Sequence, residues 1–358
     1  MTSQTESAAW CSTVLRLIES GRGFAVVTVL QAEGSTPVPA GAKAAIERDG
    51  TIHGTVGGGA VEAEARRRAM AAARSGSPAV FDFTLRGSSV RAARPICGGA
   101  MRLLVDPRVA NHVADYRRAA AALARRERGM WITTLRRTDR IEVGTRHLPG
   151  RELVGHEGFL DAAVLEACLK AETPRLLPAS SEPGLEVFIE PLVPQPVLII
   201  VGGGHVGQAV AVQAAGVGFE LQILDDRPDF ADARRFPPGA RTHSGDVAAQ
   251  LAAMPVDRDT FIVIVTRGHQ QDVEALRACI RRPAAYLGMI GSRRKVPLIR
   301  RRFLASGWAT ATEFDRVHAP IGLDIGAVTV PEIAASIVAQ LIAVRRLGAA
   351  SRITKEAA

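Results

Sequence analysis

The sequence predicts an α/β protein with two domains, the second of which is built on a doubly wound parallel sheet. At 358 residues the chain is long enough for two domains of ordinary size, each with its own core. A proline-bearing stretch from Thr173 to Pro196 separates two compositional regimes. In the second half, apolar strands alternate with helical stretches, the order that yields a parallel sheet. We therefore predict an N-terminal α+β or α/β domain over residues 1–190, a linker over 191–196 and a parallel-sheet domain over 197–358.

The N-terminal domain is predicted to mix helices with hairpin strands. Asp49-Gly50 lies between two strand-like stretches, and this dipeptide favours the type I′ turn of a β-hairpin. Gly57-Gly58-Gly59 then leads into a helix. In chain order we expect a helix at 8–20, strands at 24–30, 44–48 and 51–56, a helix at 60–74, a strand at 100–105, a helix from Asp106-Pro107 to about 128, strands at 130–135 and 140–146, a helix at 158–171 and a strand at 185–190.

The second half opens with a glycine cluster between a strand and a helix. Gly202-x-Gly204-x-x-Gly207 follows the apolar run 197–200, and this arrangement exposes backbone N–H groups to a phosphate at a helix N-terminus. The next strand ends in Asp225-Asp226, at the offset of about twenty residues where an acid meets a ribose hydroxyl in dinucleotide folds. Residues 197–226 therefore predict a Rossmann-like domain, with the alternative that the glycines serve only helix–strand packing. Further strands are expected at 219–224, 261–265 and 286–290, and helices after Gln270, from Ser292 and at 331–345.

Composition narrows the class of protein. The chain is 47% apolar and has no apolar run near the roughly 18 residues of a membrane span, and its first residues lack the layout of a secretory signal, so we expect a cytoplasmic protein. The four cysteines are scattered without a C-x-x-C pair, which indicates neither a zinc site nor a disulfide framework. The net charge of +9 comes largely from Arg-rich helical stretches, and it favours solubility and an anionic ligand over nucleic acid.

Three loops are predicted at the carboxyl ends of the parallel strands, where open α/β sheets bind ligands. The first contains Arg267 and His269, and the third runs from His318 to Gly326. The second places Ser292 as an N-cap and the cations 293–295 at a helix start, where exposed amides and charge both attract phosphate. Each histidine is either a proton carrier or a structural hydrogen bonder, and the basic turn is either an anion site or a solvated helix start.

Two glycine-rich junctions of the N-terminal half carry candidate ligand contacts. Cys97 is followed by Gly98-Gly99, which let another group approach the backbone closely, and nearby Arg94 favours the thiolate. Gly57-Gly58-Gly59 with Glu62 is either an anion seat at a helix start or a tight turn whose acid meets the helix dipole. The alternative for Cys97 is a small buried residue at a strand start.

These pieces together resemble one family, the XdhC/CoxI-type accessory proteins, from about residue 12 to residue 347. The N-terminal domain of the family is similar to this chain at Gly34-Ser35-Thr36-Pro37, Pro39-Ala40-Gly41-Ala42-Lys43, 57–62 and 97–99. Its Rossmann domain is similar to this chain at 202–207, Asp225-Asp226-Arg227, 266–269, 288–295 and 318–326.

This resemblance implies a chaperone for molybdenum cofactor (molybdopterin). Such a protein protects the cofactor while a cysteine desulfurase supplies the sulfido ligand, and passes it to apo xanthine dehydrogenase or a related molybdenum hydroxylase. We also expect a homodimer and no turnover chemistry. Ala60 stands where some members have cysteine, and only Cys97 stands where some have two, so a thiol pair is not expected. The predicted cofactor-binding residues are Gly57, Gly58, Gly59, Glu62, Cys97 (as a sulfur or molybdenum contact), Gly98, Gly99, Gly202, Gly204, His205, Gly207, Asp225, Arg267, His269, Ser292, Arg293, Lys295 and His318.

Two other classes of protein stay open on sequence grounds. The glycine motif with Asp225 also suits an NAD-dependent oxidoreductase, in which His269 or His318 is the acid/base group. A nucleotide-sensing regulatory protein is the third possibility. Neither a Ser-His-Asp order nor a Walker lysine nor a metal-ligand spacing occurs, which argues against standard hydrolases, P-loop proteins and metalloproteases.

Overall fold

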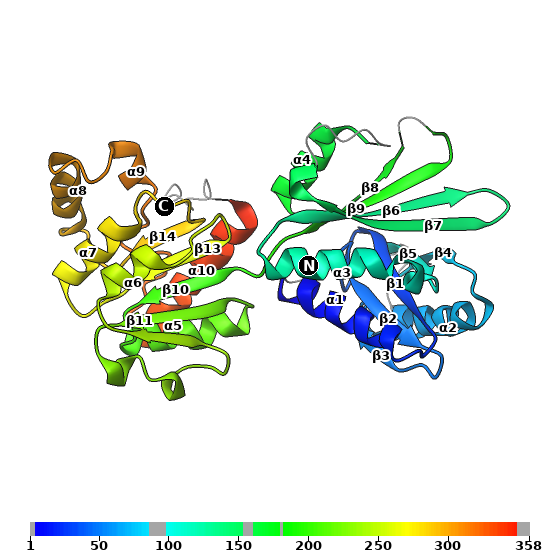
Figure 1. Cartoon of the computed structure of the whole chain (residues 1–358), viewed down its shortest axis with the longest axis horizontal. Coiled ribbons are helices and arrows are strands. Elements are labelled where there is room, and N and C mark those ends of the chain that lie inside the picture. Colours follow the sequence, from blue (N-terminus) through cyan, green and yellow to red (C-terminus); the bar gives the residue numbers. More distant parts are fainter. Residues whose placement is uncertain (1–3, 86–97, 153–159, 180–181, 349–358) are drawn as a thin grey trace, which may run out of the picture. The chain divides into compact units, whose positions relative to one another are not determined.

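The computed structural model describes residues 4–85, 98–152, 160–179 and 182–348. They fall into two compact units, Met1–Pro194 and Gln195–Ala358, which Figure 1 draws in blue to green and in green to red. Each unit has its own sheets and its own core. Within the described ranges, no helix combines the length and the apolar character needed to cross a bilayer.

The first unit is an α+β domain with two antiparallel sheets, as the N-terminal part of the prediction allowed. One sheet has the strand order β3-β2-β1-β5-β4 and the other has the order β7-β6-β9-β8. The elements are α1 (Gln4–Glu19), β1 (Phe24–Glu33), β2 (Lys43–Glu47), β3 (Ile52–Gly54), α2 (Gly59–Ser75), β4 (Ala79–Thr84), β5 (Ala100–Asp106), η1 (Val109–His112), α3 (Val113–Ala124), β6 (Gly129–Arg137), β7 (Ile141–Pro149), η2 (Gly150–Glu152), α4 (Ala162–Ala171), β8 (Arg175–Pro178) and β9 (Leu185–Leu192).

Strand alternation decides what each face of these sheets meets. In β2, Ala44 and Ile46 join the apolar core under α2, so Lys43 and Ala45 point to the opposite face. That face meets α1, α3 and the second sheet, whose Phe188 packs in a small core with leucines of β1, β5 and β6. Lys43 and Ala45 of β2 therefore face the space between the two sheets. Phe188, and the residues of β9 that point the same way as Phe188, face this space from the other side.

The hairpin predicted around Asp49-Gly50 is confirmed, because β2 and β3 pair antiparallel across it. The helix predicted to open at Asp106-Pro107 begins later, at Val113. Asp106 still belongs to β5, where it pairs with Val26, and one 3-10 turn intervenes before α3. The helix ends early because Arg126 adopts a left-handed conformation, with φ of 59°.

His147 on β7 gives the first unit a test of pH dependence. It is 4% exposed, and neither ring nitrogen has a hydrogen-bond partner among the described residues. Burial, reinforced by the charge of Arg118, lowers the pKa of His147. The neutral ring therefore stabilises the fold fully above about pH 6.5, the unfolded value, and this contribution is lost as the pH falls toward the folded pKa.

We expect the free energy of unfolding to drop more steeply between pH 7.5 and pH 5.5 in the wild type than in His147→Leu, because leucine removes the ring that must otherwise stay neutral. Urea titrations at the two pH values measure this difference. Equal pH dependence in the two proteins would show that the ring gains no proton on unfolding.

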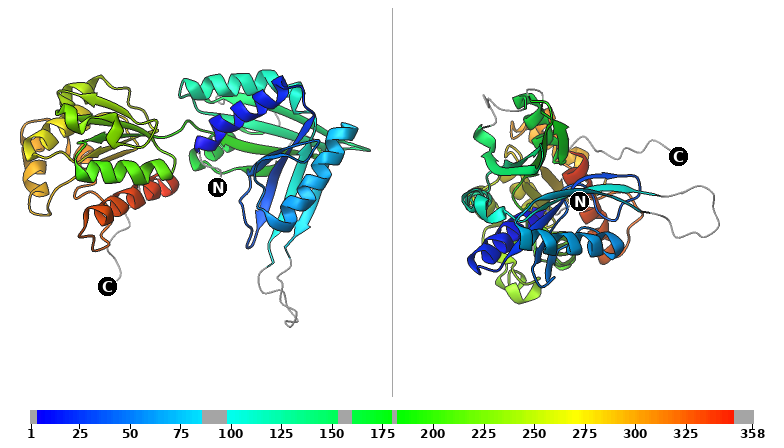
Figure 2. Two further views of the ribbon diagram at one scale, coloured as in Figure 1. Left: turned by 90° about the horizontal axis from the view of Figure 1, so that it is seen from below. Right: turned by 90° about the vertical axis from the view of Figure 1, so that its right-hand side faces the viewer.

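The second unit confirms the predicted Rossmann-like parallel sheet. Its strand order is β12-β11-β10-β13-β14, and all four strand pairs are parallel. Helices α5 and α10, which lie side by side in the left view of Figure 2, cover one face, and α6 to α9 cover the other. The elements are β10 (Val197–Val201), α5 (His205–Gly216), β11 (Glu220–Asp225), η3 (Pro228–Phe230), η4 (Ala233–Arg235), β12 (Arg241–Ser244), α6 (Val247–Ala253), β13 (Thr260–Ile264), α7 (His269–Cys279), β14 (Tyr286–Met289), α8 (Val296–Ala305), α9 (Ala311–Asp315) and α10 (Val330–Leu347).

The predicted helix start at Ser292 is wrong by four residues. Helix α8 begins at Val296, and the cations 293–295 form a turn before it. The carbonyl of Ser292 accepts hydrogen bonds from the Lys295 and Val296 backbone N–H groups, at 2.9 and 3.2 Å. Pro297 accounts for the shift, because proline fits the first turn of a helix, where its missing N–H is not needed. Ser292 is therefore not an N-cap.

Candidate functional site

The glycine cluster of the second unit forms the turn between β10 and α5. A Cβ on Gly202, whose φ is 115°, would lie 2.5 Å from the Val265 carbonyl oxygen, and a Cβ on Gly207 would overlap the Gly202 carbonyl. These two glycines therefore serve close packing of the helix on the strands. Gly204 precedes α5 and has open space around the position of a Cβ, so its neighbourhood is accessible to a ligand, as is the exposed His205.

Asp225 holds the glycine turn in place through hydrogen bonds. Its buried carboxylate accepts hydrogen bonds from the Gly203 N–H (2.8 Å) and from the Arg227 N–H, Nε and Nη2 (3.0, 2.9 and 3.1 Å). Burial alone would raise the pKa of Asp225, but the hydrogen bonds from Arg227 and Gly203 hold it below its usual value. Because a carboxylate offers about four lone-pair sites, this geometry favours a structural role. The predicted contact of Asp225 with a cofactor stays a prediction.

We expect Asp225→Asn to lower the free energy of unfolding of the second unit by about 1–3 kcal/mol, because the amide cannot accept four charge-assisted hydrogen bonds. The neighbouring variant Asp226→Asn, at a half-buried carboxylate, should cost less than about 1 kcal/mol. Urea unfolding of both variants tests the difference. Similar losses would mean that Asp225 does not hold the glycine turn.

Asp226, the residue after Asp225, forms hydrogen bonds with two side chains near the glycine turn. Its Oδ2 accepts hydrogen bonds from Arg267 Nη2 and from Gln271 Nε2, both at 2.9 Å. These bonds join the end of β11 to the loop between β13 and α7 and to the first turn of α7, across the point where the strand order reverses. His269 is the exposed first residue of α7. The structure thus gathers the predicted residues of the glycine turn (Gly202, Gly204, His205, Gly207 and Asp225) with Arg267 and His269 at the edge where α/β folds bind ligands.

The basic turn and His318 lie further along the same edge. Arg293 donates a 2.6 Å hydrogen bond to Asp324. Burial raises the pKa of Asp272, and electrostatic interactions with His269 and Lys295 partly oppose that rise. His318 forms a bridge to β14, and its ring stacks on Tyr286 at 4.6 Å. Since neighbouring strands are about 4.8 Å apart, His318 is roughly 14 Å from β10 and does not join the glycine turn.

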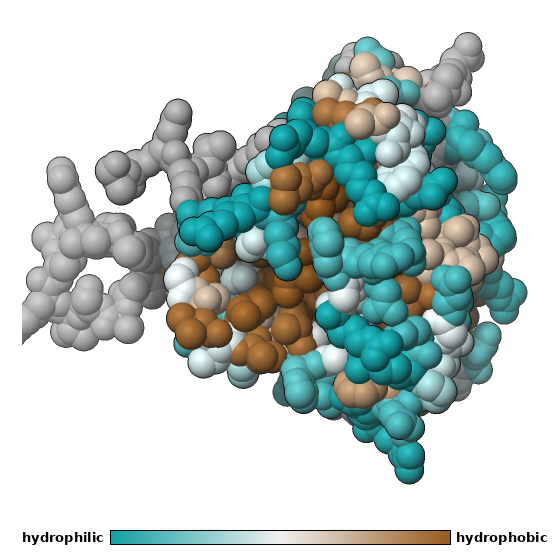
Figure 3. Space-filling model, turned by 90° about the vertical axis from the view of Figure 1, so that its left-hand side faces the viewer, coloured by the Kyte–Doolittle hydropathy of each residue, from teal (hydrophilic) through white to brown (hydrophobic). Residues whose placement is uncertain are grey.

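The loop that begins at His318 lines a hollow of the second unit. Residues of this loop and of α10 together surround a volume of about 700 Å³. Ile325 and Val328 of this segment are strongly exposed, at 58% and 82%. Figure 3 shows apolar side chains gathered on the face of this unit that it draws, bordered by hydrophilic ones.

In the first unit, the predicted glycine junction forms the start of α2. Gly57 packs on Pro37, and the Thr55 hydroxyl accepts a 3.1 Å hydrogen bond from the Gly57 N–H and donates one of 2.9 Å to Glu62. Gly58 and Gly59 have φ of 69° and 54° and face open space. The junction therefore presents the start of a 17-residue helix to solvent, a position that attracts anions, with Glu62 beside it as a built-in negative charge.

Gly98 and Gly99 serve the approach of another part of the chain. A Cβ on Gly99 would overlap the Ser35 carbonyl, and a Cβ on Gly34 would lie 3.1 Å from the Gly98 carbonyl oxygen. Gly34 and Gly99 thus let these two segments of backbone approach each other closely. Cys97, the predicted sulfur or molybdenum contact, lies outside the described residues.

The other three cysteines are buried thiols. Burial raises the pKa of Cys11 and of Cys279 to about 12, and it also raises the pKa of Cys168. A neutral, buried thiol is a poor nucleophile and a poor metal ligand. Among the residues that the structure describes, no cluster of His, Cys, Asp and Glu has the makings of a metal site.

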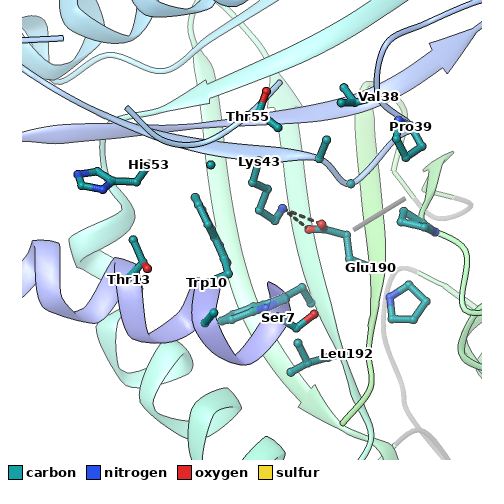
Figure 4. A pocket seen from close by; sticks show the side chains of 17 residues that line it. Ser7, Trp10, Thr13, Val38, Pro39, Lys43, His53, Thr55, Glu190 and Leu192 are labelled. Carbon is teal, nitrogen blue, oxygen red and sulfur yellow. Dashed lines mark hydrogen bonds and ion pairs between the residues drawn. The ribbon is translucent and has the colours of Figure 1, made fainter. Parts of the chain in front are cut away.

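A cavity of about 330 Å³ between the two sheets of the first unit was not predicted. Lys43 and Glu190 meet in it, with the Lys43 Nζ 2.7 Å from each carboxylate oxygen (Figure 4). Their side chains are only 14% and 9% exposed. The alternation of side chains along β9 could have indicated the position of Glu190. Residues two apart on a strand point to the same face, so Glu190 points inward with the apolar Phe188. The other lining residues are Ser7, Ala9, Trp10, Thr13, Val38, Pro39, Gly41, Ala42, His53, Gly54, Thr55, Trp131, Pro174, Pro191 and Leu192.

Comparison with known families covers both units. The model described as the XdhC and CoxI family matches residues 17–84, and the model described as the XdhC Rossmann domain matches residues 198–341. The chain belongs to the XdhC and CoxI family. The matched ranges of this family contain Lys43, both glycine clusters and the basic turn, whereas Cys97 and Glu190 lie outside them.

Three curated relatives are similar to almost the whole chain. The uncharacterized protein YqeB of Escherichia coli is 27% identical over 92% of this chain, which spans only 45% of that protein. A Bacillus subtilis protein, named as a probable subunit of xanthine dehydrogenase, is 24% identical over 92% of this chain and 96% of its own. The molybdenum cofactor insertion chaperone PaoD of Escherichia coli is 25% identical over 93% of this chain and 88% of its own.

A solved structure shares the fold of this XdhC-family chain. It is a chain described as a xanthine dehydrogenase from Bacillus halodurans, with a TM-score of 0.71 and 24% sequence identity. The match covers 96% of each chain, so both units have counterparts there.

Proposed function

We propose that this chain is a molybdenum cofactor chaperone for xanthine dehydrogenase or a related molybdenum hydroxylase. The observation that carries the proposal is its likeness, over 93% of the chain, to a protein named as a molybdenum cofactor insertion chaperone. The Bacillus subtilis relative is named as a probable part of xanthine dehydrogenase, which supports that class of target. In the proposed sequence of events the chain binds the cofactor, shields it while a cysteine desulfurase supplies the sulfido ligand, and releases it into the apo-enzyme.

The described surface offers chemistry suited to this cargo, which carries a phosphate. The start of α2 and the start of α5 both present backbone N–H groups to solvent. Arg293 and Lys295 add exposed positive charge near α8. We propose that the phosphate binds at one of these positions, that Cys97 contacts the sulfur or molybdenum, and that the active form is a cytoplasmic homodimer.

Cofactor retention tests the binding step. Purified protein is incubated with free molybdenum cofactor without oxygen and passed through gel filtration, and molybdenum and pterin are then measured in the protein peak. We expect near-stoichiometric retention by the wild type, at least tenfold weaker binding by Cys97→Ala, and no change in Cys168→Ala, which alters a buried thiol of the same chain.

Two outcomes contradict the proposal or part of it. If the wild type retains no cofactor but binds NAD in a calorimetric titration, an oxidoreductase function replaces the chaperone. If Cys97→Ala retains the cofactor as well as Cys168→Ala does, the chaperone stands and the role of Cys97 is rejected.

A further inference from the structure

We propose that the cavity of the first unit binds the pterin ring of the cargo, with Lys43 donating to the ring carbonyl and Glu190 accepting from the neighbouring N–H. This inference rests on the proposed function and assigns the ring to a place in the chain. The residues involved are distinct from the predicted glycine loops. The same chemistry, a fused ring with a lactam edge, also occurs in purines, so the test separates the two.

The walls of the cavity suit a flat, uncharged ring. Trp10 of α1 and Trp131 of β6 contribute indole surfaces, and Pro39 and Pro174 contribute rigid apolar ones. Figure 4 shows Trp10 on the helix facing the side of the cavity that holds Lys43 and Glu190. The volume of about 330 Å³ falls at the lower end of the range for small-molecule sites, which bury flat ligands between apolar walls and fix them with a few polar groups.

The polar groups select a lactam edge by their opposite charges. A bare phosphate would be repelled by Glu190, and a cation would be repelled by Lys43. A lactam places a carbonyl next to an N–H, so one edge of a neutral ring offers an acceptor to the ammonium and a donor to the carboxylate. The carboxylate retains lone pairs after bonding Lys43, because each of its oxygens accepts more than one hydrogen bond.

Stability alone gives a weak reason for this ion pair. Desolvation of two charges largely offsets their attraction in a buried pair, so apolar residues of similar volume would hold the sheets as well. A second pair, Arg102 with Glu186, already bridges β5 and β9 with two hydrogen bonds of 2.7 Å. That pair does not line the cavity, and Glu186 lies on the same strand as Glu190, so it provides a matched control.

Thr55 connects the cavity to the start of α2. It lines the cavity wall, and its hydroxyl is bonded to the Gly57 N–H and to Glu62. The start of α2, where Gly58 and Gly59 face open space and the Glu62 carboxylate lies beside them, is therefore only a few residues along the chain from the cavity wall.

Titration of the full chain with free pterin, followed by quenching of tryptophan fluorescence, tests the inference. We expect saturable binding by the wild type and at least tenfold weaker binding by Glu190→Gln, with Glu186→Gln unchanged. A second pair of variants does not touch the ion pair. Ala9→Phe adds a ring at an exposed position of the cavity lining and should weaken binding at least tenfold, whereas Ala8→Phe, exposed but outside the lining, should not.

The same variants are assayed for retention of the intact cofactor, so that the two proposals fail separately. Full retention by the wild type, Glu190→Gln and Ala9→Phe alike would overturn the cavity assignment and leave the chaperone function standing. Binding of xanthine in place of pterin would also overturn it, because the cavity would then serve a purine. Absence of retention by the wild type would remove the proposed function and this inference with it.

Discussion

Gly207→Ala is expected to destabilise the second unit by about 3 kcal/mol or more, whereas Gly204→Ala should cost less than about 1 kcal/mol. The methyl group on residue 207 would overlap the backbone carbonyl of Gly202, which is itself held between strands and cannot move without disturbing them. Gly204 has φ of −69° and no atom within 4 Å of the added methyl group, so alanine fits there.

Urea unfolding followed by Trp308 fluorescence measures both variants. Trp308 reports on this unit alone, because the other two tryptophans of the chain, Trp10 and Trp131, belong to the first unit. Equal stability of the two variants would show that α5 does not require the close approach to the Gly202 turn.

Lys43→Met is expected to lower the free energy of unfolding of the first unit by about 3 kcal/mol, because it leaves the Glu190 carboxylate buried without its cation. The double variant Lys43→Met/Glu190→Leu removes both charges and should recover most of the loss. Arg102→Met provides the comparison, since that pair is 21% and 32% exposed and its loss should cost about 1 kcal/mol or less.

Unfolding followed by Trp10 and Trp131 fluorescence measures this series. If the double variant is as unstable as Lys43→Met, the loss does not come from an unpaired Glu190 charge, because the double variant lacks that charge. The ion pair would then contribute to stability in its own right, which would weaken the case that it is present for a ligand.

The elements that sequence reasoning predicted are those whose local pattern is strong. The apolar run 197–200 next to a glycine cluster has one common solution, and β10 followed by α5 is what the structure contains. The sequence did not predict the edge strand β12. Its four residues, Arg241 to Ser244, show no alternation of apolar and polar side chains and include a single β-branched residue, a threonine. Such a strand forms because β11 offers an unpaired edge, which is tertiary information.

The candidate site was predictable in its backbone and less so in its side chains. Motif spacing located Gly202 and Gly207, whose role is set by close approach of the backbone, but it could not tell which of two adjacent acids points inward. The buried Asp225 carboxylate accepts a hydrogen bond from the Gly203 N–H of the glycine turn, whereas the Asp226 carboxylate accepts one from Arg267 at the surface. Lys43 and Glu190 are 147 residues apart, and only the packing of two sheets brings them together.

The central claim is that this chain carries molybdenum cofactor to a hydroxylase, and transfer measures it most directly. The cofactor-loaded protein is mixed without oxygen with an apo xanthine dehydrogenase-type enzyme, the two are separated, and molybdenum content and hydroxylase activity are followed over time. The account predicts that molybdenum leaves this chain and appears in the hydroxylase together with activity, faster than from the same amount of free cofactor. Molybdenum that stays on this chain, or activation no faster than with free cofactor, would contradict it.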